Sequence, residues 1–137
     1  MRLIALAASV AGIAVSIYLT AVHFAGVPLA CPTGAAVNCE AVLSSPYGVI
    51  AATSVPTSVA GIVWFAISTV LWLRPRGRLP LLWSAVGIVT VLYLVFIEIV
   101  RLGTICVLCS IAHFLVLVIF IVALTRSVPQ ADAGGTA

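Results

Sequence analysis

The sequence predicts an all-α integral membrane protein in which four transmembrane helices form a bundle with both termini in the cytoplasm. Hydrophobic residues make up 64% of the 137 residues, charged residues make up 7%, and the mean hydropathy is +1.37. Soluble domains are about 25% charged. The net charge of +3 results from six arginines and three acidic residues. The arginines are too few and too scattered for a nucleic-acid surface.

Each predicted transmembrane helix corresponds to one apolar stretch. The four stretches are Leu3–Phe24, Val55–Leu73, Leu81–Ile97 and Leu102–Leu124. Each fits the roughly 17–25 residues that a spanning helix needs, and the first is longer than the apolar core of a secretory signal, about 7–15 residues. We therefore predict one membrane domain over 1–126, with an outer loop at 25–54. A disordered cytoplasmic tail is expected at 127–137, and no soluble domain is expected.

The arginines predict the orientation of the bundle. Five of them precede the first stretch, join the second to the third, or follow the fourth: Arg2, Arg74, Arg76, Arg78 and Arg126. Because cytoplasmic segments are enriched in basic residues, these five should face the cytoplasm and Arg101 the outside. We expect a multi-pass protein of the inner (plasma) membrane whose outer loop and last span begin on the extracytoplasmic face. All four cysteines then lie where disulfides persist.

The stretch "TICVLCSIAH" (104–113) places two thiols at the start of the last span. Cys106, Cys109 and His113 share one face of a helix because they are three and seven residues apart. We predict Thr104 as the helix cap, so that both cysteines lie in the first two turns. Free backbone N–H groups there lower thiol pKa values and favour disulfide exchange. Simple packing of buried cysteines is the alternative.

A second cysteine pair, Cys31 and Cys39, lies in the outer loop, and four cysteines allow three disulfide connectivities. Gly34 and two alanines predict a pliable segment between them. Asn38 is a good N-cap, so a short helix is expected over 39–43, with Cys39 at its start as the better nucleophile. A plain loop staple is one alternative. A zinc site is another, although the spacing of the outer pair is unlike that of zinc ligands.

Other polar and aromatic residues have a structural and a functional interpretation. His113 lies at membrane depth, where a polar side chain suggests function, although a hydrogen bond to a neighbouring helix would also explain it. Ser45 either ends the short helix or binds a ligand. Glu98 and Arg101 are three apart and predict an ion pair, and His23 is expected at the membrane interface. The belt aromatics expected at the membrane surfaces are Trp64, Trp72, Trp83 and Tyr93.

The cysteine order resembles that of the vitamin K epoxide reductase family, including its bacterial homologues. The resemblance rests on "CPTGAAVNCEAVLSSPYG" (31–48), "VPTSVAG" (55–61) and "ICVLCSIAH" (105–113), and it covers about residues 3–125. It implies a four-helix bundle around a quinone pocket. Membrane quinone, either menaquinone or ubiquinone, is then the expected electron acceptor, and no metal is expected.

The resemblance also implies roles for individual residues. Cys106 and Cys109 resemble the active-site pair, with Cys109 reacting with the quinone, and Cys31 and Cys39 resemble the shuttle pair, with Cys39 exchanging with Cys106. Three substrate-binding residues are implied: Ser45, Thr57 and His113. Thr57 stands where vertebrate members have a quinone-binding asparagine, and this departure argues against epoxide reduction as the native task.

The sequence therefore predicts an enzyme, a thiol–quinone oxidoreductase of the lipid bilayer that supports disulfide bond formation. Many bacterial relatives carry a fused thioredoxin-like domain, so we expect a separate extracytoplasmic thioredoxin-like (DsbA-like) protein as the partner here. One alternative is a thiol-driven quinone or vitamin K epoxide reductase. The other is a non-enzymatic membrane bundle with structural disulfides or metal-binding cysteines.

Overall fold

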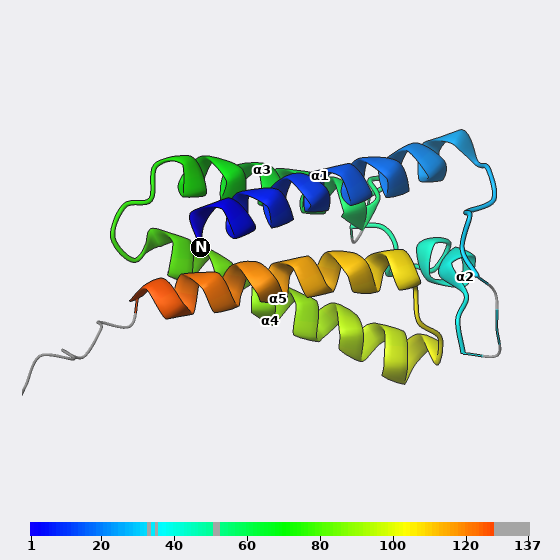
Figure 1. Cartoon of the computed structure of the whole chain (residues 1–137). Helices are drawn as coiled ribbons and strands as arrows, with labels where there is room; N and C mark the ends of the chain where they lie inside the picture. The colour runs from blue at the N-terminus through cyan, green and yellow to red at the C-terminus, as the bar shows by residue number, and fades with distance from the viewer. Residues whose placement is uncertain (33, 35, 51–52, 128–137) are drawn as a thin grey trace, which may run out of the picture.

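Four long helices lie side by side as a bundle, and a short helix covers one end (Figure 1). The computed structural model describes residues 1–32, 34, 36–50 and 53–127. In chain order its helices are α1 (Arg2–Ala25), α2 (Cys39–Leu43), α3 (Thr57–Leu73), α4 (Leu79–Phe96), the π-helical turn η1 (Ile97–Leu102) and α5 (Val107–Ser127). The predicted all-α class is confirmed over these residues. The predicted disordered tail lies outside them, apart from Ser127, which ends α5.

Three of the four predicted spans are helices long and apolar enough to cross a membrane. They are α1 with 24 residues, α4 and η1 together with 24, and α5 with 21. Helix α3 is also apolar but has only 17 residues. At 1.5 Å per residue it is about 26 Å long, which is shorter than the hydrocarbon core of a bilayer, about 30 Å. Its passage across the membrane stays a prediction, as does the orientation of the bundle.

Helices α1 and α3 pack closely because small residues line their contact. The buried face of α1 consists of Ala5, Ala8, Ser9, Gly12, Ser16 and Leu19. A Cβ atom at Gly12 would lie 2.3 Å from the Phe65 ring, and the hydroxyls of Thr20 and Ser58 are 2.8 Å apart. Small residues let membrane helices approach closely. The two helices are antiparallel, since residue numbers rise along α1 as those of its partners fall along α3.

The tryptophans face the inside of the bundle and not the membrane surfaces, so their prediction as belt aromatics is wrong. Trp72 is 1% exposed, and the Arg126 guanidinium lies 5.9 Å from the centre of its ring. Trp83 stacks on Trp64 with ring centres 6.1 Å apart and donates its Nε1–H to Ser68 Oγ at 3.0 Å. Tyr93, by contrast, is exposed on α4.

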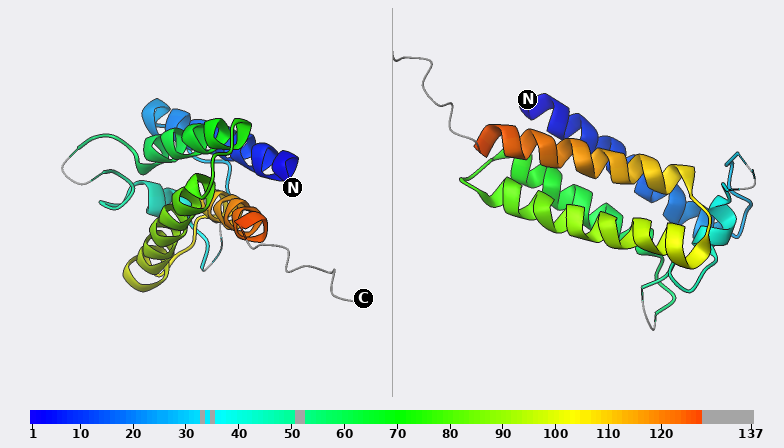
Figure 2. Two further views of the ribbon diagram at one scale, coloured as in Figure 1. Left: turned by 90° about the vertical axis from the view of Figure 1, so that its left-hand side faces the viewer. Right: turned by 90° about the horizontal axis from the view of Figure 1, so that it is seen from below.

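The two ends of the bundle differ in charge and in chemistry. Arg2 donates hydrogen bonds to the carbonyls of Trp72 (2.9 Å) and Leu73 (2.6 Å), and so caps the C-terminus of α3. The N-terminus, the loop between α3 and α4 and the end of α5 therefore meet at one end, together with five arginines. Helix α2 lies at the other end, as Figure 1 and the right-hand view of Figure 2 show. The segregation of charge agrees with the predicted orientation.

Candidate functional site

The outer loop holds a disulfide at the end of the bundle. Cys31 and Cys39 are bonded, with Cα atoms 6.3 Å apart, whereas Cys106 and Cys109 are free thiols. Cys39 begins α2, and Asn38 Oδ1 accepts a hydrogen bond from the backbone N–H of Ala41 at 3.0 Å. The predicted cap and short helix are confirmed. Because their sulfurs are bonded to each other, the outer pair offers no thiolate to a metal ion.

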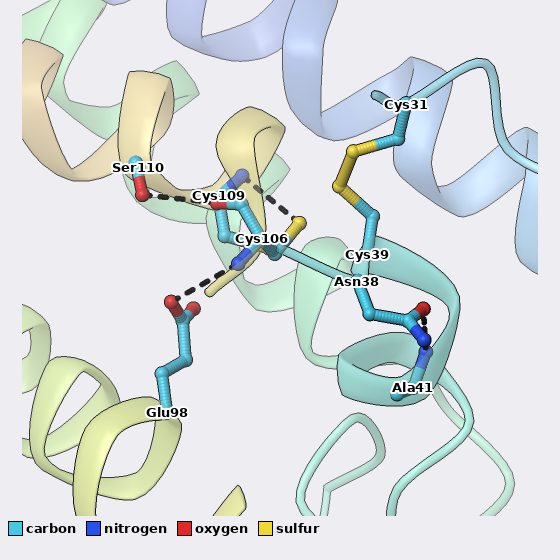
Figure 3. Close-up of a disulfide and its surroundings, with 8 residues drawn as sticks. All are labelled: Cys31, Asn38, Cys39, Ala41, Glu98, Cys106, Cys109 and Ser110. Carbon is cyan, nitrogen blue, oxygen red and sulfur yellow. Dashed lines mark hydrogen bonds between the residues drawn. A yellow bond between two sulfur atoms is a disulfide. The ribbon is translucent and has the colours of Figure 1, made fainter. Parts of the chain in front are cut away.

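Backbone hydrogen bonds hold the outer pair against the inner pair. The Asn38 N–H donates to the Ile105 carbonyl at 3.2 Å, and the Ile105 N–H donates to the Ala36 carbonyl at 3.0 Å. Cys39 and Cys106 follow these residues and are packed in one buried cluster, with exposures of 1% and 0%. In Figure 3 the sulfur of Cys106 lies on the side of the helix start that faces the disulfide. These contacts hold Asn38, and with it the start of α2, beside the start of α5.

Cys106 itself caps α5, so the predicted cap at Thr104 is wrong. The helix begins at Val107, and the backbone N–H of Cys109 donates to Cys106 Sγ at 3.3 Å. Thr104 Oγ1 is buried without a hydrogen-bond partner among the described residues. The pKa of the Cys106 thiol is lowered, first by the hydrogen bond from the Cys109 side chain and further by backbone N–H groups, against the opposing effect of burial. Cys106 is therefore the better nucleophile of the two.

A cavity of about 290 Å³ lies between the long helices beside these thiols. The three residues implied as substrate-binding, Ser45, Thr57 and His113, all line it, and so does Cys109. Cys106 and the disulfide cysteines do not. The helix start therefore separates two environments, with Cys109 on the cavity side and Cys106 on the side of the disulfide.

The polar groups of the cavity wall differ in whether they are free to bind a ligand. Ser45 Oγ donates to the Val42 carbonyl at 2.7 Å, and Thr57 Oγ1 donates to the Tyr47 carbonyl at 3.2 Å. Both hydroxyl protons are thus used in hydrogen bonds to backbone carbonyls of the cavity wall. The imidazole of His113 makes no hydrogen bond within the described part of the chain, and its helix face lines the cavity. His113 is better placed than Ser45 or Thr57 to donate to a ligand.

Glu98 turns into the bundle and does not pair with Arg101, so the predicted ion pair is wrong. Glu98 is 5% exposed, and its Oε2 accepts from the Cys106 N–H at 3.4 Å. Arg101 is exposed. Both residues lie in η1, a π-helix, whose wider turn rotates residues three apart away from the common face that they share in an α-helix.

Sequence reasoning missed three residues of the cavity wall. Glu98 was interpreted as half of an ion pair, His23 as interfacial and Trp64 as a belt aromatic, yet all three line the cavity. The Nε1–H of Trp64 is buried and has no hydrogen-bond partner among the described residues. The signal that could have found Glu98 is its position inside a predicted span, because an ionisable residue there is a functional candidate by default.

An all-helical membrane bundle with a dithiol between a cavity and a disulfide has the features of a thiol-dependent oxidoreductase. Comparison with family models supports this class and makes it specific. The chain belongs to the vitamin K epoxide reductase family, whose model matches residues 3–124. A search of curated proteins found no match. The family resemblance seen in the cysteine motifs is therefore confirmed, and the chain is an enzyme of an oxidoreductase family.

Proposed function

We propose that this protein oxidises an extracytoplasmic thioredoxin-like protein and passes the electrons to membrane quinone, and thereby supports disulfide bond formation. The observation that carries the proposal is the position of the C-x-x-C pair. Cys109 lines the cavity, while Cys106 is buried together with Cys39 of the outer disulfide. One thiol faces a small-molecule site and the other faces a second thiol pair, which is the arrangement that electron transfer from protein to quinone requires.

The exchange between the two pairs follows from their packing. A reduced partner protein reduces the Cys31–Cys39 disulfide to two thiols and is itself oxidised. Cys39 thiolate then attacks Cys106 Sγ of a Cys106–Cys109 disulfide and releases the Cys109 thiolate. Cys31 thiolate attacks Cys39 and releases Cys106. The outer pair is then oxidised and the inner pair reduced, as observed here. No atoms are gained or lost, and two electrons have moved inward.

The cavity wall fits a quinone head group. A bound quinone supplies an acceptor for two electrons and two protons. The site is largely apolar, with a few polar groups, as is typical of small-molecule sites. The buried and unpartnered Nε1–H of Trp64 and the imidazole of His113 are hydrogen-bond donors suited to quinone oxygens. Hydrogen bonds to atoms that gain charge favour the reduced product.

The test is quinone reduction by the purified protein in detergent, followed by the absorbance of menaquinone and ubiquinone analogues. A reduced thioredoxin-like protein is the electron donor, and oxidation of its thiols is measured in parallel. We expect rapid reduction that depends on all four cysteines. Cys109→Ala should abolish turnover and accumulate a Cys39–Cys106 disulfide, which mass spectrometry identifies. In this variant Cys106 thiolate attacks Cys39 of the outer disulfide and releases Cys31 thiolate, and no Cys109 thiol is present to displace Cys39.

Two controls separate the proposed function from its alternatives. Ser110→Ala changes a residue beside the pair whose hydroxyl donates only to the Cys106 carbonyl, and it should keep most of the activity. If Cys109→Ala reduces quinone as fast as the wild type, the assigned electron path is wrong. If no combination of donor and quinone gives cysteine-dependent turnover, the proposed function is wrong. The alternative of a membrane bundle with structural disulfides, which resist mild reductants, is then the better description.

Reduction of a vitamin K epoxide is the second candidate function, and the family match favours it. The same assay with the epoxide as acceptor and a dithiol as donor tests it. We expect slower turnover than with quinone, because Thr57 uses its hydroxyl proton on the Tyr47 carbonyl. Epoxide turnover equal to quinone turnover would make this candidate the better description.

A further inference from the structure

Positive charge without a counter-charge gathers at the end of the bundle that lies away from the thiols. Arg2 begins α1, and Arg126 lies in the last turn of α5. The loop between α3 and α4 carries three more arginines, Arg74, Arg76 and Arg78. The carboxylates of the described residues, Glu40 and Glu98, belong to α2 and η1 at the other end. Within the described part of the chain, no acidic side chain therefore balances the five arginines.

A second cavity, of about 130 Å³, lies among these arginines. Its wall comes from the end of α3, the loop after it, the start of α4 and the end of α5. Arg126 is the one charged residue among the described residues that line it. The guanidinium of Arg126 lies 5.9 Å from the centre of the Trp72 ring, which is buried and also lines the cavity. The cavity therefore offers a positive charge beside an aromatic wall, a combination suited to an anion.

The loop that forms part of this wall is stiffened by its own sequence. Pro75 and Pro80 both line the cavity, and proline fixes its own φ angle. Gly77 turns the chain between them with a φ of 50°, and the Leu79 N–H donates to the Arg76 carbonyl at 3.2 Å. Because the wall is formed before any ligand arrives, little conformational entropy is lost on binding.

Exposed leucines beside the cavity favour a lipid over a small soluble anion as its ligand. Leu79 and Leu82 adjoin the lining residues of α4, Leu124 adjoins those of α5, and their exposures are 50%, 61% and 44%. The helices α1, α4 with η1, and α5 are long and apolar enough to cross a membrane. At the ends of such helices, arginines lie at the level of the lipid head groups and exposed leucines meet the acyl chains. A ligand with an anionic head group and hydrocarbon chains fits both features.

We propose that this second cavity binds the phosphate of an anionic phospholipid, with Arg126 as the residue that contacts the phosphate. Guanidinium groups bind phosphate through paired, charge-assisted hydrogen bonds, and basic pockets between transmembrane helices bind anionic head groups. The three loop arginines attract the same lipid from outside the cavity wall, and the leucines contact its acyl chains. The site involves neither thiol pair, so it does not depend on the proposed function.

The experiment titrates phosphatidylglycerol into the purified protein in detergent and measures bound lipid by native mass spectrometry. Phosphatidylcholine with the same acyl chains and glycerol 3-phosphate, which has no chains, are titrated in parallel. We expect saturable binding of phosphatidylglycerol and much weaker binding of the other two. Arg126→Gln should weaken the affinity for phosphatidylglycerol at least about tenfold, because charge-assisted hydrogen bonds are lost. Arg101→Gln removes an exposed arginine at the opposite end and should match the wild type.

A second variant, Arg126→Lys, keeps the positive charge beside Trp72 and decides the question if Arg126→Gln does not fold. An ammonium group lacks the planar fork that binds phosphate through two hydrogen bonds, so its affinity for phosphatidylglycerol should fall between those of the wild type and Arg126→Gln. Thermal unfolding without added lipid shows whether each variant is folded. Wild-type affinity in folded Arg126→Gln, or in Arg126→Lys where Arg126→Gln is unfolded, overturns the inference. An equal loss in Arg101→Gln overturns it as well, since total charge alone would then explain binding. Equally tight binding of phosphatidylcholine or of glycerol 3-phosphate would exclude an anionic phospholipid as the specific ligand.

Discussion

At the scale of single residues, the inner pair combines two thiols with different surroundings. Cys106 Sγ receives a backbone hydrogen bond and is shielded from the cavity, while Cys109 faces it. In a C-x-x-C pair the first thiol at a helix start has the lowered pKa. The cysteine motif predicted lowered pKa values for both thiols and did not predict this asymmetry. The sequence placed the cap two residues too early, because the Cys106 N–H, which a Thr104 cap could have used, donates to Glu98 instead, and the helix begins at Val107.

The lowered pKa of Cys106 makes its reactivity with alkylating agents dependent on Cys109. Alkylation by iodoacetamide follows the thiolate fraction, so Cys106 should react at a pH below that of an unperturbed thiol. Cys109→Ala removes the hydrogen bond that lowers this pKa, and the reaction should then begin at higher pH. Mass spectrometry of the Cys106 peptide measures both profiles. Coincident profiles for the two proteins would contradict the assigned hydrogen bond.

His113 should set the affinity for quinone without affecting the thiols. His113→Phe removes a hydrogen bond that is worth about 0.5–1.5 kcal/mol, so the KM for quinone should rise about 2- to 12-fold. His113→Gln keeps a donor and should show a smaller rise. Steady-state kinetics give the KM, and the rate of Cys31–Cys39 reduction by dithiothreitol provides the control. A KM that is the same for both variants and the wild type would exclude the imidazole as a quinone ligand.

At the scale of elements, the helices follow the hydrophobic pattern but their ends do not. The four apolar stretches and the helix at 39–43 were predictable, because length, apolar composition and the Asn38 cap are local properties. The π-helical turn was not, since its wider hydrogen-bonding pattern depends on how the chain enters the Gly103 turn, which has a φ of 62°. As a result the sequence predicted that Glu98 and Arg101 share one helix face and form an ion pair, whereas Glu98 turns into the bundle. The cavity brings together residues from α1, α3, η1 and α5, and no local pattern predicts such a convergence.

Gly87 should control the shape of the cavity through Trp64. A Cβ atom there would lie 2.3 Å from Trp64 Cζ2 and 3.0 Å from Val116 Cγ1, so Gly87→Ala forces the indole to move. We expect a loss of stability of about 1–3 kcal/mol from overpacking and a higher KM for quinone. Thermal unfolding in detergent and the quinone assay measure the two effects. Gly34→Ala, where nothing lies within 4 Å of the added atom, should be close to neutral in both. Equal Tm values for the two variants would refute the packing argument.

At the scale of the whole molecule, five arginines gather at one end of the bundle and the cysteine pairs lie at the other. The arginines at one end and the disulfide at the other agree with the orientation that the sequence predicts. Arg2 joins the N-terminus to the middle of the chain, because its hydrogen bonds to the α3 carbonyls fix the start of α1 beside the end of α3. A tertiary contact of this kind could not be predicted from the sequence. The sequence shows only that the start of α1 and the loop after α3 both carry arginines.

Labelling from outside the cell tests the orientation directly. In a variant whose four cysteines are replaced by alanine, Ser44→Cys and Ser127→Cys place single thiols at exposed positions at opposite ends of the bundle. A membrane-impermeant maleimide should label the Ser44→Cys thiol in intact cells. It should label the Ser127→Cys thiol only after the membrane is opened. Labelling of both thiols in intact cells would mean an odd number of spans, with α3 outside the bilayer.

The pair of backbone hydrogen bonds between Ile105 and the segment before Cys39 has a kinetic consequence. The outer cysteines are not carried on a free arm that must diffuse to its target, because the chain is already anchored beside Cys106. Exchange between the pairs then needs rotation of side chains over short distances, and its rate should not depend on solvent viscosity. Under the proposed function, only the encounter with a separate thioredoxin-like protein would require diffusion, so higher viscosity should slow that encounter and leave the exchange between the two pairs unchanged.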